Sequence, residues 1–166
     1  MGLAAAILAL VTAQRLVEAA WARANARRLL ARGAAEAGAG HFWPLIGLNA
    51  AWLAGLWVLA PGAPVSWPWL AVYLALQAGR AWTLWTLGRR WTHRIVVVPG
   101  ETLVAAGPYR FVRHPNYAVL AGEVAVLPLV FGLSLYAAAF GLVNAAMLAW
   151  RIGVEDRALA TLGGRR

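Results

Sequence analysis

The polar residues best suited to chemistry in this 166-residue chain lie in the segment 88–117, between long apolar stretches. The segment reads GRRWTHRIVVVPGETLVAAGPYRFVRHPNY and leads into an apolar run at Pro115. Pro is favoured at the first position of a helix, because its missing N–H would have no partner there. The free backbone N–H groups of such a helix start, beside Arg113 and His114, predict a site for an anion such as a carboxylate or a phosphate.

A second polar feature, the pair Arg151 and Glu155, follows the last apolar stretch. Residues four apart share one face of a helix, and an ion pair at this spacing contributes about 0.3 kcal/mol. The position of the pair favours a role beyond such an ion pair, because ionisable groups at a membrane boundary that face the bundle tend to serve sites. The two features together predict one pocket on one face of a membrane.

Several other kinds of site have no support in the sequence. The chain has three His and no Cys, and their spacing fits no metal site, so we expect none. The glycine patterns of dinucleotide-binding folds and phosphate-binding loops are absent, and so is the nucleophile pattern of hydrolases.

The elements that must position these residues are membrane helices. Hydrophobic residues make up 62% of the chain and charged residues 13%, and the mean hydropathy is +0.64. A soluble domain has about a quarter of its residues charged. A helix needs about 20 apolar residues to cross a bilayer. The apolar segments are Leu3–Trp21, Phe42–Ala60, Trp67–Leu87 and Tyr117–Trp150.

The fourth segment is long enough for two short passes. It contains Leu127-Pro128 and Phe131-Gly132, a combination that breaks helices, so we expect a helical hairpin with arms of about 12 to 16 residues. The prediction is an all-α integral membrane protein of about five transmembrane helices, in a single domain over residues 1–166. Three spans occupy residues 1–87, and residues 88–166 hold the polar loop, the hairpin and a C-terminal helix. Residues 33–40 are expected to form a flexible loop.

The charged residues predict the orientation of the chain. The net charge is +9, and all 15 cations are Arg. Thirteen of them follow the first span, the third span and the hairpin, whereas the connection Pro61–Ser66 has none. With the N-terminus outside, these clusters all lie on the cytoplasmic side, as the positive-inside rule requires. The use of Arg in place of Lys is typical of a GC-rich genome and favours a bacterial source. In a bacterium, we expect a protein of this kind in the plasma membrane. Within the spans, we expect Arg15 and Glu18 to form a buried pair.

The polar residues, taken in order, resemble the isoprenylcysteine carboxyl methyltransferase family of integral membrane enzymes, which is also related to phospholipid methyltransferases. The resemblance covers about residues 88–160. It rests on Thr102-Leu103-Val104, Gly107-Pro108-Tyr109, Arg113-His114-Pro115-Asn116-Tyr117, and Arg151 with Glu155. The first half of the chain is similar to a short bacterial branch, often linked to type III polyketide synthases, that methylates alkylpyrones or alkylresorcinols. The chain lacks the aromatic tail of the eukaryotic enzyme and has Asp156 where the family often has a second Glu, differences that concern the substrate more than the chemistry.

The resemblance implies an S-adenosylmethionine-dependent O-methyltransferase with a cytoplasmic cofactor pocket and a lipophilic or prenylated acceptor that enters from the bilayer. Arg151 would be the catalytic and substrate-binding residue and would face the acceptor oxygen. The residues implied for cofactor binding are Thr102, Leu103, Val104, Tyr109, His114, Pro115, Asn116, Tyr117 and Glu155. The alternatives are a phospholipid N-methyltransferase, a transporter subunit and a sterol reductase. Membrane lipids are expected partners, nucleic acid is not, and the oligomeric state is left open.

Overall fold

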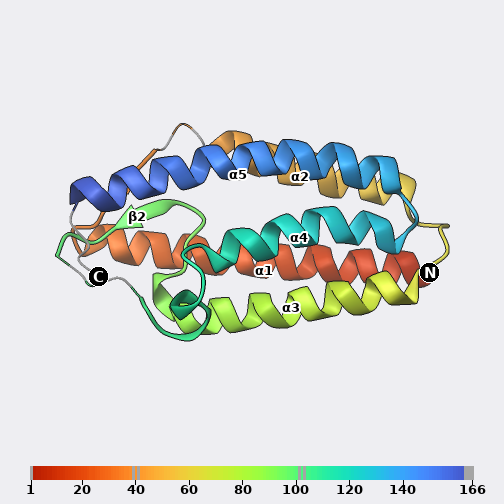
Figure 1. Cartoon of the computed structure of the whole chain (residues 1–166), viewed down its shortest axis with the longest axis horizontal. Coiled ribbons are helices and arrows are strands. Elements are labelled where there is room, and N and C mark those ends of the chain that lie inside the picture. The colour runs from red at the N-terminus through yellow and green to blue at the C-terminus, as the bar shows by residue number, and fades with distance from the viewer. Residues whose placement is uncertain (1, 39, 41, 101, 103, 163–166) are drawn as a thin grey trace.

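The computed structural model describes residues 2–38, 40, 42–100, 102 and 104–162. Over these residues the fold is a bundle of five α-helices, with a small sheet and two short 3₁₀ helices at one end (Figure 1). The α-helices are α1 (Leu3–Ala31), α2 (Phe42–Leu59), α3 (Trp67–Leu87), α4 (Pro115–Val130) and α5 (Ser134–Leu162). The 3₁₀ helices are η2 (Gly88–Arg90) and η3 (Gly107–Arg110), and the strands are β1 (Ala35–Ala37) and β2 (Ile95–Val97).

Proline and glycine residues set the limits of the later helices. Pro115 begins α4, as predicted from its fixed φ and missing N–H. The chain leaves α4 at Phe131, and Gly132 follows with a φ of 73°, in the left-handed region that glycine adopts readily. The N–H groups of Gly132 and Leu133 donate to the carbonyls of Leu129 and Pro128 and thereby close the end of the helix.

The second arm after this turn is longer than predicted. Helix α5 has 29 residues and continues without a break through Arg151 and Glu155 to its end, whereas α4 has 16 residues. The prediction of a short arm was wrong because no Pro occurs after Pro128 and nothing else in this segment interrupts a helix. A single helix therefore runs from the turn at Gly132 along the length of the bundle to the polar end (Figure 1).

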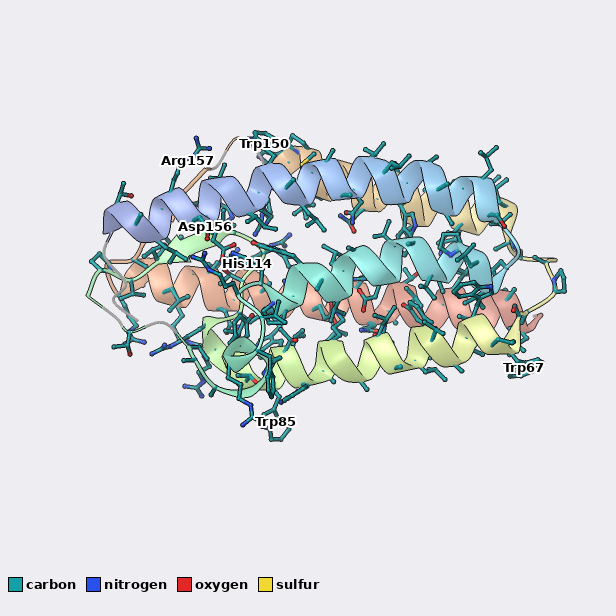
Figure 2. The ribbon with its side chains drawn as sticks, viewed as in Figure 1. Trp67, Trp85, His114, Trp150, Asp156 and Arg157 are labelled. Atoms are coloured by element: carbon teal, nitrogen blue, oxygen red, sulfur yellow. The ribbon has the colours of Figure 1, made fainter. Side chains whose placement is uncertain are left out.

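Three helices, α1, α2 and α5, are long and apolar enough to cross a membrane. Helix α4 is shorter. Helix α3 has 21 residues but carries Gln77 and Arg80 among its apolar side chains. The outer face of α3 presents Trp67 and Trp85, which point away from the bundle (Figure 2), as indole rings do at a membrane surface.

A network of buried charges joins α1, α3 and α4. The Arg80 guanidinium donates to both Glu18 and Glu123, and Arg15 donates to Glu123 over 2.7 Å. Gln77 also donates to Glu123, whose side chain is fully buried. The predicted Arg15–Glu18 pair was therefore wrong. The two residues lie on the same helix, but each finds its partner on another helix, since groups inside a bundle pair with whichever neighbouring helix faces them.

Residues 33–40 contain a strand, so the prediction of a flexible loop was also wrong for this part. Strand β1 pairs antiparallel with β2, with Ala35 opposite Val97 and Ala37 opposite Ile95. Ile95 and Val97 pack against Ala158 of α5. The sheet thus connects the segment after α1 to the polar segment and to the last helix.

Candidate functional site

A cavity of about 540 Å³ lies at the end of the bundle that carries the sheet. Its walls come from segments distant in the sequence: the ends of α1 and α3, residues 90–98, residues 102–110, the start of α4 and the last turns of α5. Pockets of this volume typically hold small molecules or cofactors. The Arg-rich segment between α3 and α4 lies at this same end and contributes Arg90, Arg94, Arg110 and Arg113 to the cavity lining.

Most of the predicted site residues line this cavity. They are Thr102, Val104, Tyr109, His114, Asn116, Tyr117, Arg151 and Glu155. Pro115 does not line it, since its buried ring forms the first turn of α4. Leu103 lies outside the described residues. The order of motifs along the sequence thus does correspond to one place in the fold.

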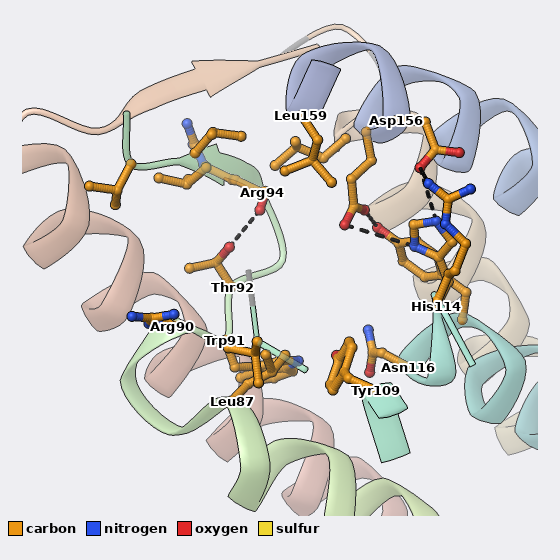
Figure 3. Close-up of a pocket in the computed structure, with 18 of the residues that line it drawn as sticks. Leu87, Arg90, Trp91, Thr92, Arg94, Tyr109, His114, Asn116, Asp156 and Leu159 are labelled. Carbon is orange, nitrogen blue, oxygen red and sulfur yellow. Dashed lines mark hydrogen bonds and ion pairs between the residues drawn. The ribbon is translucent and has the colours of Figure 1, made fainter. Parts of the chain in front are cut away.

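The start of α4 differs in part from the predicted anion site. The N–H groups of Tyr117 and Ala118 donate to the His114 carbonyl and are not free for a ligand. Nε2 of His114 lies 3.2 Å from the Asp156 carboxylate, and Arg113 lies 3.7 Å from the same carboxylate. His114 and Asp156 are labelled in Figures 2 and 3. A carboxylate of the chain itself, that of Asp156, is therefore the partner of the two side chains that were predicted to flank an anion site.

Arg151 and Glu155 do not form a direct ion pair. The Nε of Arg151 donates to the Tyr117 hydroxyl over 2.8 Å, and that hydroxyl donates to Glu155. A second N–H of the guanidinium, on NH2, donates to the His93 carbonyl over 2.6 Å. The Arg151 side chain is thus fixed from two sides, while Tyr117 joins it to the carboxylate one turn further along α5.

Three buried polar atoms of residues that line the cavity have no hydrogen-bond partner among the residues that the structure describes. They are NH1 of Arg151, Nε1 of Trp91 and Oδ1 of Asn116. A buried polar group without a hydrogen bond costs about 1–3 kcal/mol, and most such groups in folded proteins find a partner. Two donors and one acceptor are therefore available to a bound molecule.

The tyrosine of η3 has an environment that keeps it neutral. Burial, and then the negative charge of Glu155, raise the pKa of Tyr109 above its ordinary value. Its position depends on Gly107, whose φ is 56° and whose hydrogen faces the Thr86 side chain at the end of α3. Tyr109 thus offers an uncharged hydroxyl and a ring at the cavity wall (Figure 3).

His93 lies beside this site. Its ring makes an edge contact with the Trp91 ring, with centroids 4.9 Å apart. Burial, and then the charge of Arg80, lower the pKa of His93 to about 4. At neutral pH this imidazole is therefore uncharged, and positive charge on this side of the site comes from Arg151.

The segment 90–98 lines much of the cavity, and its lining residues include Trp91, Thr92 and Arg94. None of these residues was predicted to belong to the site. The segment was recognised as polar, but its individual residues match none of the motifs. Trp91 is one of ten Trp, and nothing in the sequence distinguishes it from the others. In the structure it is 2% exposed and lines the cavity, whereas Trp52, which is equally buried, belongs to the apolar core of the bundle.

Comparison with known proteins agrees with this geometry. The model of the isoprenylcysteine carboxyl methyltransferase family matches residues 69–161, which include α4, most of α5 and the loop between α3 and α4. The chain is 38% identical over 159 residues to the uncharacterized protein YpbQ of Bacillus subtilis (strain 168), covering 92% of this chain and 94% of that protein. No solved structure matches the chain. Since the family match covers more than half of the chain and agrees with the predicted resemblance, the chain belongs to the isoprenylcysteine carboxyl methyltransferase family, whose members are methyltransferases that use S-adenosylmethionine.

Proposed function

We propose that this protein transfers the methyl group of S-adenosylmethionine to an oxygen atom of a lipophilic acceptor. The observation that carries the proposal is the unpartnered NH1 of Arg151, which is buried at the cavity while the rest of the guanidinium is held by Tyr117 and His93. An N–H fixed in this way is ready to bind an acceptor oxygen. The positive charge disfavours an amine acceptor, which argues against the phospholipid N-methyltransferase alternative.

The residues of the cavity suit the cofactor. Glu155 and Asp156 provide carboxylates for its amino group or ribose hydroxyls, and Oδ1 of Asn116 is a free acceptor. The rings of Tyr109 and Tyr117 lie at the same cavity and attract a cation such as a sulfonium. Because His114 is already paired with Asp156, and the N–H groups of Tyr117 and Ala118 donate to the His114 carbonyl, we place the amino acid part of the cofactor beside these acidic residues and not at the start of α4.

When bound, the cofactor supplies a methyl group that is activated by a positively charged sulfur. Bonding of the acceptor oxygen to the methyl carbon would break the carbon–sulfur bond, with S-adenosylhomocysteine as the leaving group. Arg151 holds the oxygen and stabilises it as an anion, and any proton on it passes to water. Such a displacement depends mainly on alignment, which agrees with an Arg151 side chain that is fixed by two hydrogen bonds.

The acceptor is proposed to enter from the bilayer, with an alkylpyrone, an alkylresorcinol or a prenylcysteine as candidates. Phe111 and Val112 are exposed beside Arg110 and Arg113, which line the cavity. Apolar side chains next to cationic ones suit the membrane surface, where a tail stays in lipid and a polar head reaches the cavity. Purified protein is to be incubated with radiolabelled S-adenosylmethionine and each candidate. Transfer to oxygen supports the proposal, whereas cofactor binding without transfer to any candidate contradicts it.

We propose that the cavity faces the cytoplasm of a bacterial cell and that the N-terminus lies outside. Since the chain has no Cys, single substitutions such as Gly62→Cys and Arg32→Cys provide clean labelling sites at opposite ends of the bundle. Both positions are exposed. An impermeant thiol reagent on spheroplasts is expected to label Gly62→Cys at once and Arg32→Cys only after permeabilisation. The reverse pattern would invert the orientation.

A further inference from the structure

The indole of Trp91 is held in a fixed position at the cavity. It is 2% exposed and packs with Ala22, Leu84 and Leu87, and the Trp21 ring lies at 5.3 Å between centroids. The Trp91 carbonyl accepts a hydrogen bond from Asn25, a fully buried residue of α1, over 2.9 Å. A ring supported on all these sides has little freedom to find another partner for its N–H.

The indole N–H nevertheless has no acceptor in the described part of the chain, residues 2–38, 40, 42–100, 102 and 104–162. Trp91 lies at the cavity together with Tyr109 and Asn116 (Figure 3). A buried Trp ordinarily finds a hydrogen-bond partner for this group. The unpaired N–H of a firmly positioned ring therefore indicates an acceptor atom on a bound molecule.

Trp91 and Arg151 are coupled through one residue. The carbonyl of His93, two residues after Trp91, accepts the hydrogen bond that fixes NH2 of Arg151, and the His93 ring contacts the Trp91 ring. One short segment thus positions two unpaired donors, Nε1 of Trp91 and NH1 of Arg151, at the same cavity. His93 is uncharged at neutral pH and adds no charge that would compete with Arg151.

We propose that Trp91 is an acceptor-binding residue and that this enzyme selects head groups with two oxygen atoms that share a negative charge. NH1 of Arg151 holds one oxygen and the Trp91 N–H donates to the other. A carboxylate fits this pair of donors, and so does an acidic enol conjugated to a carbonyl. An isolated phenol presents only one oxygen. The inference rests on the proposed function, since it names the kind of acceptor that the site takes.

The test compares two acceptors of equal alkyl chain length, a hydroxypyrone with two conjugated oxygens and a simple alkylphenol with one. In Trp91→Phe the ring is kept and the N–H is lost, and Trp85→Phe on the exposed face of α3 is the matched control. The expected result is a KM for the hydroxypyrone raised about tenfold in Trp91→Phe, the magnitude of one lost hydrogen bond of about 1.4 kcal/mol. The KM for the alkylphenol and the affinity for S-adenosylmethionine are expected to stay within twofold.

An equal rise in KM for both acceptors would overturn the inference, because the indole would then serve packing. A lower affinity for S-adenosylmethionine would also overturn it, because the N–H would then bind the cofactor. If Trp91→Phe does not fold, benzothienylalanine at position 91 keeps the shape of the ring and replaces the N–H by sulfur.

Equilibrium binding of the hydroxypyrone to protein loaded with S-adenosylhomocysteine separates this inference from the proposed function. Binding that weakens in the variant while the wild type transfers no methyl group supports the role of Trp91 and refutes the transfer. Absence of binding to the wild type refutes the inference.

Discussion

Arg80 binds Glu18 through two nitrogens of its guanidinium, with Nε at 2.8 Å from Oε1 and 3.0 Å from Oε2, and NH2 at 2.5 Å from Oε2. The remaining nitrogen, NH1, lies 2.9 Å from Glu123. One side chain of α3 therefore neutralises carboxylates of both α1 and α4. This pairing is what allows charged groups inside a bundle whose outer surface is apolar.

Loss of this arginine is expected to destabilise the bundle strongly. Arg80→Gln leaves two buried carboxylates without their main partner, and breaking a buried ion pair costs about 3–5 kcal/mol. Thermal unfolding in detergent measures the effect, and Arg89→Gln, at an exposed position outside the network, is the control. Equal unfolding temperatures for the two variants would mean that the network contributes nothing to stability.

Substitutions of Arg151 and Glu155 are expected to separate turnover from cofactor binding. Arg151→Lys keeps a charge but loses the planar arrangement of donors, so kcat is expected to fall about 100-fold while cofactor affinity changes little. Glu155→Ala is expected to abolish cofactor binding in calorimetry. Unchanged cofactor affinity in Glu155→Ala would rule out its assignment as a cofactor ligand.

The Tyr117 hydroxyl connects these two residues, so Tyr117→Phe is expected to impair both functions. The variant removes the acceptor for Nε of Arg151 and the donor to Glu155. We expect a kcat lowered about 10-fold and a cofactor affinity lowered by a similar factor, since each loss corresponds to about one hydrogen bond. A change in only one of the two parameters would show that Arg151 and Glu155 act independently.

His93 is expected to make stability depend on pH. The folded protein keeps this imidazole neutral down to about pH 4, whereas in the unfolded chain it binds a proton near its ordinary pKa of 6.5. As the pH falls from 6.5 toward 4, only the unfolded state gains the proton, so stability falls in this window. His93→Gln cannot titrate. The decrease in unfolding temperature between pH 7 and pH 4.5 should therefore be smaller in the variant, and an equal decrease would refute the prediction.

Gly107 permits the close approach of η3 to α3. A Cβ at this position would lie 2.4 Å from Oγ1 of Thr86, and the φ of 56° is strained for any other residue. Gly107→Ala is expected to destabilise the fold by about 1–3 kcal/mol and to weaken cofactor binding by shifting Tyr109. Gly153→Ala, inside α5 with open space around it, is expected to stabilise by about 0.5–1 kcal/mol. If both variants were destabilised, or both stabilised, the special role of Gly107 in the approach of η3 to α3 would be refuted.

Local signals in the sequence predicted much of the fold. Pro115 marks the start of α4, and the change of direction near Gly132 follows from the conformations that Pro and Gly impose. The order of motifs in the sequence predicted that Tyr109, His114 and Arg151 share one site, and the three residues line one cavity. These features depend on backbone preferences or on motifs whose spacing is visible in the chain itself.

Features that depend on contacts between distant segments were missed. The spacing of Arg15 and Glu18 suggests a pair within one helix, but the orientation of α1 toward α3 and α4 decides their partners. The pairing of β1 and β2 involves strands of three residues each, too short for a periodic pattern. Trp91 could not be distinguished from nine other Trp before its burial was known.

The buried charge network has a consequence for the biosynthesis of this protein. Glu18 and Arg15 are synthesised 62 and 108 residues before their partners Arg80 and Glu123. Each charge in the centre of a bilayer costs about 2.5–3.5 kcal/mol on the insertion scale when it is unpaired. Helix α1 therefore leaves the ribosome before the partners that its two charged side chains have in the folded bundle. Until α3 and α4 are synthesised, Arg15 and Glu18 have only one another and Gln14 on their own helix, so the final pairing of charges forms after the first helix is complete.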